Sequence, residues 1–103
     1  MKQKQQLIII NKLYMIKVEN VISSRGNAIA NQFIIEVDGD VYFQSYKSII
    51  AKIDKLGNVT LDERYWDYSI TTGRYRNIFL GENKKETLEK IESGKYKLAN
   101  LNE

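Results

Sequence analysis

Apolar and polar residues alternate along the first half of the chain, with the period of two that is typical of β-strands. The first such segment begins at residue 14, and its apolar positions are Tyr14, Ile16 and Val18. These positions predict a half-buried strand. A loop is expected next at residues 23–27, Ser-Ser-Arg-Gly-Asn, where Gly26 supplies flexibility.

Residues 33–43 form the strongest hairpin pattern, because two β-rich runs flank Asp38-Gly39. A two-residue loop sets Ile35 opposite Tyr42, so the apolar residues of the two strands do not all lie on one face of the hairpin. A three-residue loop aligns a set of apolar residues on one face, Phe33, Ile35, Val41 and Phe43. We favour the three-residue loop, which leaves the opposite face with Ile34, Tyr42, Gln44 and Tyr46.

A second hairpin follows at residues 48–61, with its turn at residues 55–58. Alternation places Ile50 and Lys52 on the outer face of its first strand, and the inward residues are Ile49, Ala51 and Ile53. Together with the first strand, the two hairpins predict an antiparallel meander of about five strands.

Two helices are predicted after the sheet. Ser69 can cap the first helix and Gly81 can end it in a left-handed conformation. Its expected buried face is Thr71, Tyr75, Ile78 and Phe79. In the second helix, Asn83 and Glu86 form a capping-box pattern and Gly94 marks the end.

A short closing strand is expected around residues 96–98, with Leu101 as a possible further member. The predicted fold class is α+β, with an antiparallel sheet of about five strands and two short helices near the C-terminus. Residues 15–103 form one domain in this interpretation. Residues 1–14 are an N-terminal extension, partly disordered or an added strand, and Met15 is an alternative translation start.

Composition excludes several kinds of chemistry. The chain contains neither Cys nor His, which removes thiolate nucleophiles, the usual general base near neutral pH and the commonest transition-metal ligand. Paired acids such as Asp38 with Asp40, or Asp62 and Glu63 with Asp67, remain, but they occur in turn and loop sequences. We therefore predict no enzyme activity, no cofactor and no metal.

The net charge of +3 does not imply a broad nucleic-acid-binding face, because the excess lies within residues 1–20, which contain four Lys and one Glu. The apolar run at residues 7–10 is too short for a signal peptide or a membrane span. These patterns predict a protein that stays in the compartment where it is made and does not enter the membrane.

A cluster of arginines and tyrosines is the candidate binding surface, because Arg and Tyr dominate hot spots in protein interfaces and also line single-stranded nucleic-acid grooves. Its predicted contact residues are Tyr46, Arg64, Tyr65, Arg74 and Arg76. Arg74 and Arg76 diverge on a helix, so one of them is expected to face solvent. Trp66 is interpreted as a structural residue that anchors the helix to the sheet.

Several short motifs carry a family resemblance. In chain order they are Asn31-Gln32-Phe33, Phe43-Gln44-Ser45-Tyr46, Trp66-Asp67-Tyr68-Ser69, Thr71-Thr72, and Tyr75 through Phe79-Leu80-Gly81. Over residues 15–100 the chain resembles a family of small uncharacterised proteins encoded by phages and prophages of low-GC bacteria. The resemblance implies an accessory phage protein made in the bacterial cytoplasm, without implying an activity.

The leading hypothesis is non-catalytic binding that inhibits a host or anti-phage defence protein, for example a CRISPR effector. The alternative is a nucleic-acid-binding accessory protein that uses the basic N-terminus and exposed tyrosines. A third hypothesis, a sponge for a nucleotide signal, requires an oligomer with a pocket between subunits.

Overall fold

The computed structural model describes residues 15–103. The expectations for residues 1–14, including the start of the first strand at Tyr14, lie outside the described residues.

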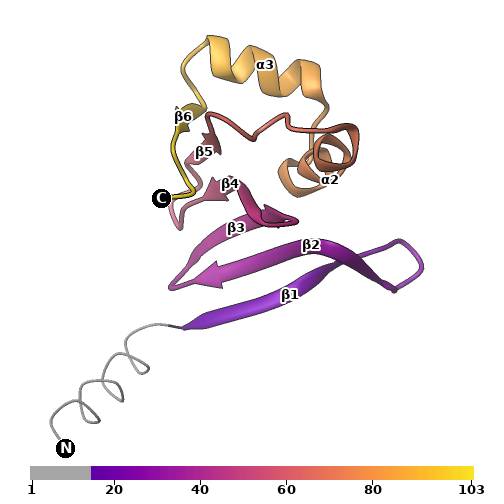
Figure 1. The fold of residues 1–103 in the computed structure, drawn as a ribbon. Helices are drawn as coiled ribbons and strands as arrows, with labels where there is room; N and C mark the ends of the chain where they lie inside the picture. Colours follow the sequence, from indigo (N-terminus) through magenta and orange to yellow (C-terminus); the bar gives the residue numbers. More distant parts are fainter. Residues whose placement is uncertain (1–14) are drawn as a thin grey trace, which may run out of the picture.

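The described chain forms one six-stranded sheet in the order β1-β2-β3-β4-β5-β6, with two helices on one side of it (Figure 1). The elements are β1 Ile16–Ile22, β2 Ala28–Val37, β3 Asp40–Ser45, β4 Ser48–Ile53, β5 Val59–Asp62, α2 Ile70–Leu80, α3 Lys84–Glu92 and β6 Lys97–Ala99. All neighbouring strands are antiparallel except β5 and β6, which are parallel. The predicted α+β class is confirmed, with one strand more than expected.

The β2–β3 turn has two residues, so the predicted three-residue loop is wrong. Val37 pairs with Asp40 and Ile35 with Tyr42. Asp38 and Gly39 both have positive φ, 50° and 91°, as a type I′ turn requires, and this turn matches the twist of the strands. Turn geometry therefore sets the register of this hairpin.

A bulge changes the second hairpin. Phe43 pairs with Ala51 while the next residue, Gln44, pairs with Ile49, which leaves Ile50 as the extra residue in β4. Ile50 is buried, so its predicted outward position is wrong. The hairpin continues as expected through the turn at residues 55–58 into β5.

Both predicted ends of α2 are confirmed. The Ser69 hydroxyl accepts a hydrogen bond from the Thr72 amide, and Gly81 adopts φ 69°. The predicted buried face is wrong, however, because Thr71 and Ile78 are exposed. The residues of α2 that are buried are Thr72, Gly73 and Arg76.

The contact between α2 and the sheet combines a polar and an aromatic pair. The hydroxyls of Ser45 and Thr72 hydrogen-bond at 2.9 Å, and the rings of Phe43 and Phe79 stack at 5.7 Å between centroids. Phe43 and Ser45 therefore face α2, and Ile34, which pairs with Phe43, shares that face.

The core lies under the helices at the β4–β6 end of the sheet. Its buried cluster is Ala51, Val59, Leu61 and Tyr96, with Trp66, Phe79, Leu80 and Ile91 packed against it. The predicted structural role of Trp66 is confirmed by this packing. Among residues 15–103, no helix is long and apolar enough to cross a membrane.

The opposite end of the sheet is less covered. β1 occurs where a strand was predicted, but it is not half-buried on its apolar side, because Ile16 is 66% and Val18 59% exposed. These residues pair with Val37 and Ile35 of β2 on the face away from the helices. The apolar side of β1 thus faces solvent.

The capping box of α3 is confirmed, since the side chains of Asn83 and Glu86 each accept the other residue's backbone amide. Next to it, the Glu82 carboxylate accepts hydrogen bonds from Lys90 Nζ at 2.6 Å, Thr87 Oγ1 at 2.6 Å and Tyr96 OH at 2.7 Å. Burial favours the neutral form of Glu82, but these three donors outweigh it and hold the pKa below its ordinary value of 4.5. Glu82 thereby joins α3 to Tyr96, the residue that precedes β6.

This network predicts a pH-dependent stability. A carboxylate with a lowered folded pKa stabilises the fold above its unfolded pKa, so the free energy of unfolding should fall as pH drops below about 4.5. Burial and then Glu82 raise the pKa of Tyr96, so stability should also fall as pH rises above about 10. Urea unfolding across pH 3–11 measures both decreases in the free energy of unfolding. Glu82→Gln should reduce the decrease at acid pH. An unchanged decrease would contradict the assignment of this stability to the Glu82 carboxylate.

Candidate functional site

Three tyrosines, Tyr46, Tyr65 and Tyr68, line a cavity of about 450 Å³ between the β3–β4 turn and the β5–α2 loop. We call these three residues the tyrosine surface. The rings of Tyr65 and Tyr68 meet edge to face at 5.6 Å between centroids. Tyr46 is 50% and Tyr68 68% exposed, so the surface offers aromatic area to a partner.

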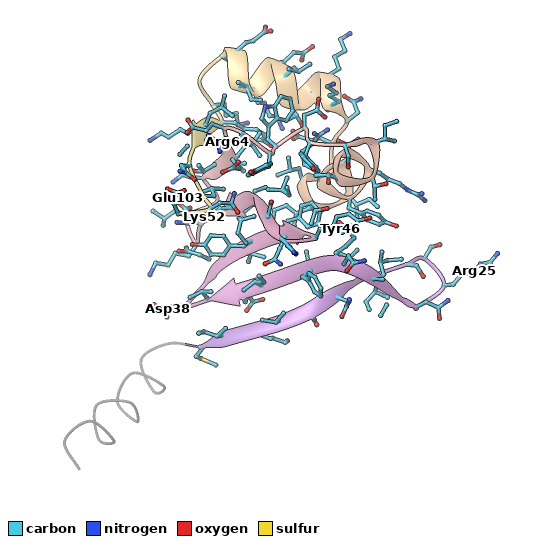
Figure 2. The ribbon with its side chains drawn as sticks, in the orientation of Figure 1. Arg25, Asp38, Tyr46, Lys52, Arg64 and Glu103 are labelled. Carbon is cyan, nitrogen blue, oxygen red and sulfur yellow. The ribbon has the colours of Figure 1, made fainter. Side chains whose placement is uncertain are left out.

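Tyr46 is held in an unfavourable backbone conformation. Its φ is 56°, which is uncommon for a bulky residue because the Cβ crowds the backbone. Two hydrogen bonds fix it there: its amide donates to Asn31 O at 2.7 Å, and Gln44 Nε2 donates to its carbonyl oxygen at 2.7 Å. Figure 2 labels Tyr46 at the end of β3 that lies nearer α2. The fold thus presents the ring of Tyr46 at a conformational cost.

Asp62 orders the loop that carries Arg64 and Tyr65. Its buried carboxylate accepts hydrogen bonds from the amides of Arg64 at 3.0 Å, Tyr65 at 2.8 Å and Leu101 at 2.8 Å. Burial opposes ionisation, but these amides together with Asn102 hold the pKa of Asp62 below 3.8. The acid is therefore a structural residue that positions its neighbours.

A second, polar cavity of about 370 Å³ adjoins the tyrosine surface. Tyr65 borders both cavities, and Tyr46 lines the first while Arg64 lines the second. The polar cavity is lined by charges of both signs, contributed by Lys47, Asp62, Glu63, Arg64 and Glu103. Arg64 and Glu103 are labelled on this part of the molecule in Figure 2. The structure thus brings three predicted contacts, Tyr46, Arg64 and Tyr65, to adjoining cavities.

Arg76 lies inside the protein, at 1% exposure, so its predicted contact with a partner is wrong. Its guanidinium donates to Trp66 O at 2.8 Å and Asp67 Oδ1 at 3.0 Å, and it stacks 5.1 Å from the Trp66 ring. A buried guanidinium needs such partners to compensate for lost hydration. Arg76 is therefore a structural residue.

Arg74 is the exposed member of the pair, as the divergence of the two residues predicted. It lies near Tyr75, with 5.7 Å between the guanidinium and the ring centroid. Arg74 lines a broad, open cavity of about 820 Å³ along the outer side of α2, together with Ile70 and Ile78. This cavity is a different one from those beside the tyrosine surface.

The acids singled out from the sequence do not converge. Asp67 pairs with Arg76 and with Lys84 Nζ at 2.7 Å, and Asp40 accepts the amide of Lys55 at 3.0 Å. Within residues 15–103, no group of three or more acids is placed to hold a metal ion.

Tyr68 is a member of the site that the sequence interpretation missed as a contact. The spacing of Tyr65 and Tyr68, three residues apart beside Trp66, was the available signal. Because these residues precede α2 in a turn, periodicity did not indicate which of them faces solvent.

Comparison with known proteins identifies the family of the chain. Residues 16–95 match the model of a family of unknown function, DUF8033, and the chain belongs to this family. No curated protein and no solved structure matched the chain. The match covers strands β1 to β5, both helices and all three tyrosines of the tyrosine surface, and it ends before β6.

The two arginines of α2 provide a matched test of the structural assignment. Arg76→Ala should lower the free energy of unfolding by about 3 kcal/mol, because it leaves a cavity against Trp66 and takes a partner from Asp67. Arg74→Ala should change it by less than about 0.5 kcal/mol. Urea unfolding measures both values, and equal effects would contradict the different placement of the two side chains.

Proposed function

We propose that the protein is a phage-encoded accessory protein that acts by binding and without catalysis, inhibiting a host or anti-phage defence protein in the bacterial cytoplasm. A CRISPR effector is the first such partner to test. The mechanism is steric: the tyrosine surface occupies a functional site of the partner. The observation that supports this proposal most strongly is the gathering of Tyr46, Tyr65 and Tyr68 around one cavity.

Tyrosines suit this task because each supplies a large contact area with few rotatable bonds. Hot spots in interfaces are enriched in Tyr and Arg and lie in well-packed concave regions. Arg64 borders the adjoining cavity, at the rim of the tyrosine surface. The strained backbone at Tyr46 also favours a functional interpretation, since such conformations occur preferentially at binding sites.

The charges around the tyrosine surface favour a protein partner over a nucleic acid. Lys47 and Arg64 could contact phosphates while the tyrosines stack on bases. Glu63 and Glu103 line the same cavity as these two basic residues, and they would repel a phosphate backbone. A mixed-charge rim instead suits complementary pairing with another protein surface.

Tyr46→Asn separates binding from stability. Asn tolerates positive φ better than Tyr, so the variant should keep or raise the melting temperature while it loses the ring that contacts the partner. We expect binding to the target to weaken by about tenfold or more, as for a hot-spot residue. Thermal unfolding measures the melting temperature. Calorimetric titration against purified CRISPR effectors, with a phage-plating assay in cells that carry them, measures the loss of binding.

Tyr68→Ala should weaken binding similarly. Arg74→Ala, in the separate cavity along α2, tests whether the contact extends to that helix. Tyr42→Ala is the matched control, because Tyr42 lies on the helix-free face of β3. Unchanged affinity in both Tyr46→Asn and Tyr68→Ala would exclude the tyrosine surface as the contact with the partner.

Binding of single-stranded oligonucleotides that declines steeply with salt would favour the nucleic-acid alternative.

A further inference from the structure

Strand β1 forms one edge of the sheet, opposite the helices (Figure 1). Its inner side pairs with β2, and within residues 15–103 no strand pairs with its outer side. The straight part of this edge is residues 16–20, because the register with β2 shifts between Asn20 and Ile22. An unpaired edge of this kind can accept a further strand.

One hydrogen bond establishes which peptide groups of β1 face outward. The Asp38 amide donates to Met15 O at 3.0 Å, so Met15 bonds toward β2. Bonding alternates along an antiparallel strand, so Lys17 and Glu19 also bond toward β2. The residues that direct their N–H and C=O groups to the open edge are therefore Ile16, Val18 and Asn20.

We propose that β1 pairs antiparallel with β1 of a second copy, with Val18 opposite the partner's Val18. This pairing places two outward-facing peptide units opposite each other and joins the two sheets into one. It also sets Ile16 opposite the partner's Asn20. The interaction is a dimer in which each copy supplies the same strand, as a twofold axis requires.

Charge selects this register over its neighbours. With Val18 at the centre, Lys17 lies opposite the partner's Glu19, and the symmetry makes two such pairs. A shift in one direction would place Lys17 opposite Lys17, and a shift in the other would place Glu19 opposite Glu19. Opposite charges across strands stabilise a sheet and like charges destabilise it.

The geometry of the pair strengthens this selection. Val18 forms a hydrogen-bonded pair with its counterpart, so Lys17 and Glu19 occupy the alternate, non-hydrogen-bonded position. Residues at that position approach to roughly 4.5 Å between Cα atoms, and their side chains are close. The pairing also brings the exposed side chain of Val18 beside its copy, with Ile16 diagonally across from the partner's Val18.

The second copy is expected to bind weakly, because one strand pair buries less area than a standard protein interface. Sedimentation velocity of the full chain should show a mass that rises from 12.0 kDa toward twice that value as concentration increases from about 10 µM to about 1 mM. The dimer leaves the tyrosine surface accessible, since that surface is formed by the β3–β4 turn and the β5–α2 loop.

A charge-swap experiment tests the register. Lys17→Glu and Glu19→Lys should each weaken the dimer by about tenfold, because each creates two pairs of like charges. The double variant K17E/E19K restores both pairs and should recover the dissociation constant of the wild type. Lys97→Glu, an exposed lysine on β6 at the opposite edge, is the control and should have no effect.

Hydrogen exchange gives a readout that needs no substitution. The amides of Val18 and Asn20 should become protected as protein concentration rises, whereas the exchange of Lys17 should change little. The proposal is overturned if the wild type keeps a mass of 12.0 kDa throughout, as would follow if residues 1–14 occupied the edge. It is equally overturned if the double variant fails to regain the affinity lost in the single variants.

Discussion

The helical part of the molecule depends on one buried cation, the guanidinium of Arg76. It stacks on Trp66 and pairs with Asp67, and Asp67 also pairs with Lys84 at the start of α3. The β5–α2 loop, the middle of α2 and the first turn of α3 therefore meet at a single carboxylate. Burial favours the neutral form of Asp67, but the hydrogen bonds from Lys84 and Arg76 keep its pKa below 3.8. The ion pair thus joins both helices to the loop that follows β5.

Local signals in the sequence predicted the elements well, and the errors came from interactions between distant residues. Ser69 and Asn83 cap their helices through neighbouring amides, so short-range patterns were sufficient. The buried face of α2 was misplaced because a hydrophobic pattern treats Arg76 as a surface residue. Its burial requires Trp66 and Asp67, which periodicity does not reveal. Similarly, the bulge that buries Ile50 arises from the pairing of two strands.

The motifs behind the family resemblance largely have structural roles. Ser45 and Ser69 both form hydrogen bonds with the Thr72 hydroxyl. The carbonyl oxygen of Asn31 accepts a hydrogen bond from the amide of Tyr46, and Asp67 pairs with Arg76. These residues therefore identify a fold more directly than an activity. Of the predicted contacts, Tyr46, Arg64 and Tyr65 came together because two turns meet at one end of the sheet. The sequence gives no direct sign of that meeting.

The uneven cover of the sheet divides the molecule into parts of different cooperativity. α2 packs mainly on β3 and β4, while β1 is held mainly by β2. A strand held by only one neighbour can detach in a subglobal opening that costs less than complete unfolding. The part of the sheet covered by the helices would stay folded during such an opening. The edge strand β1 is the part of the protein that proteases and chaperones would first meet in a partly open chain.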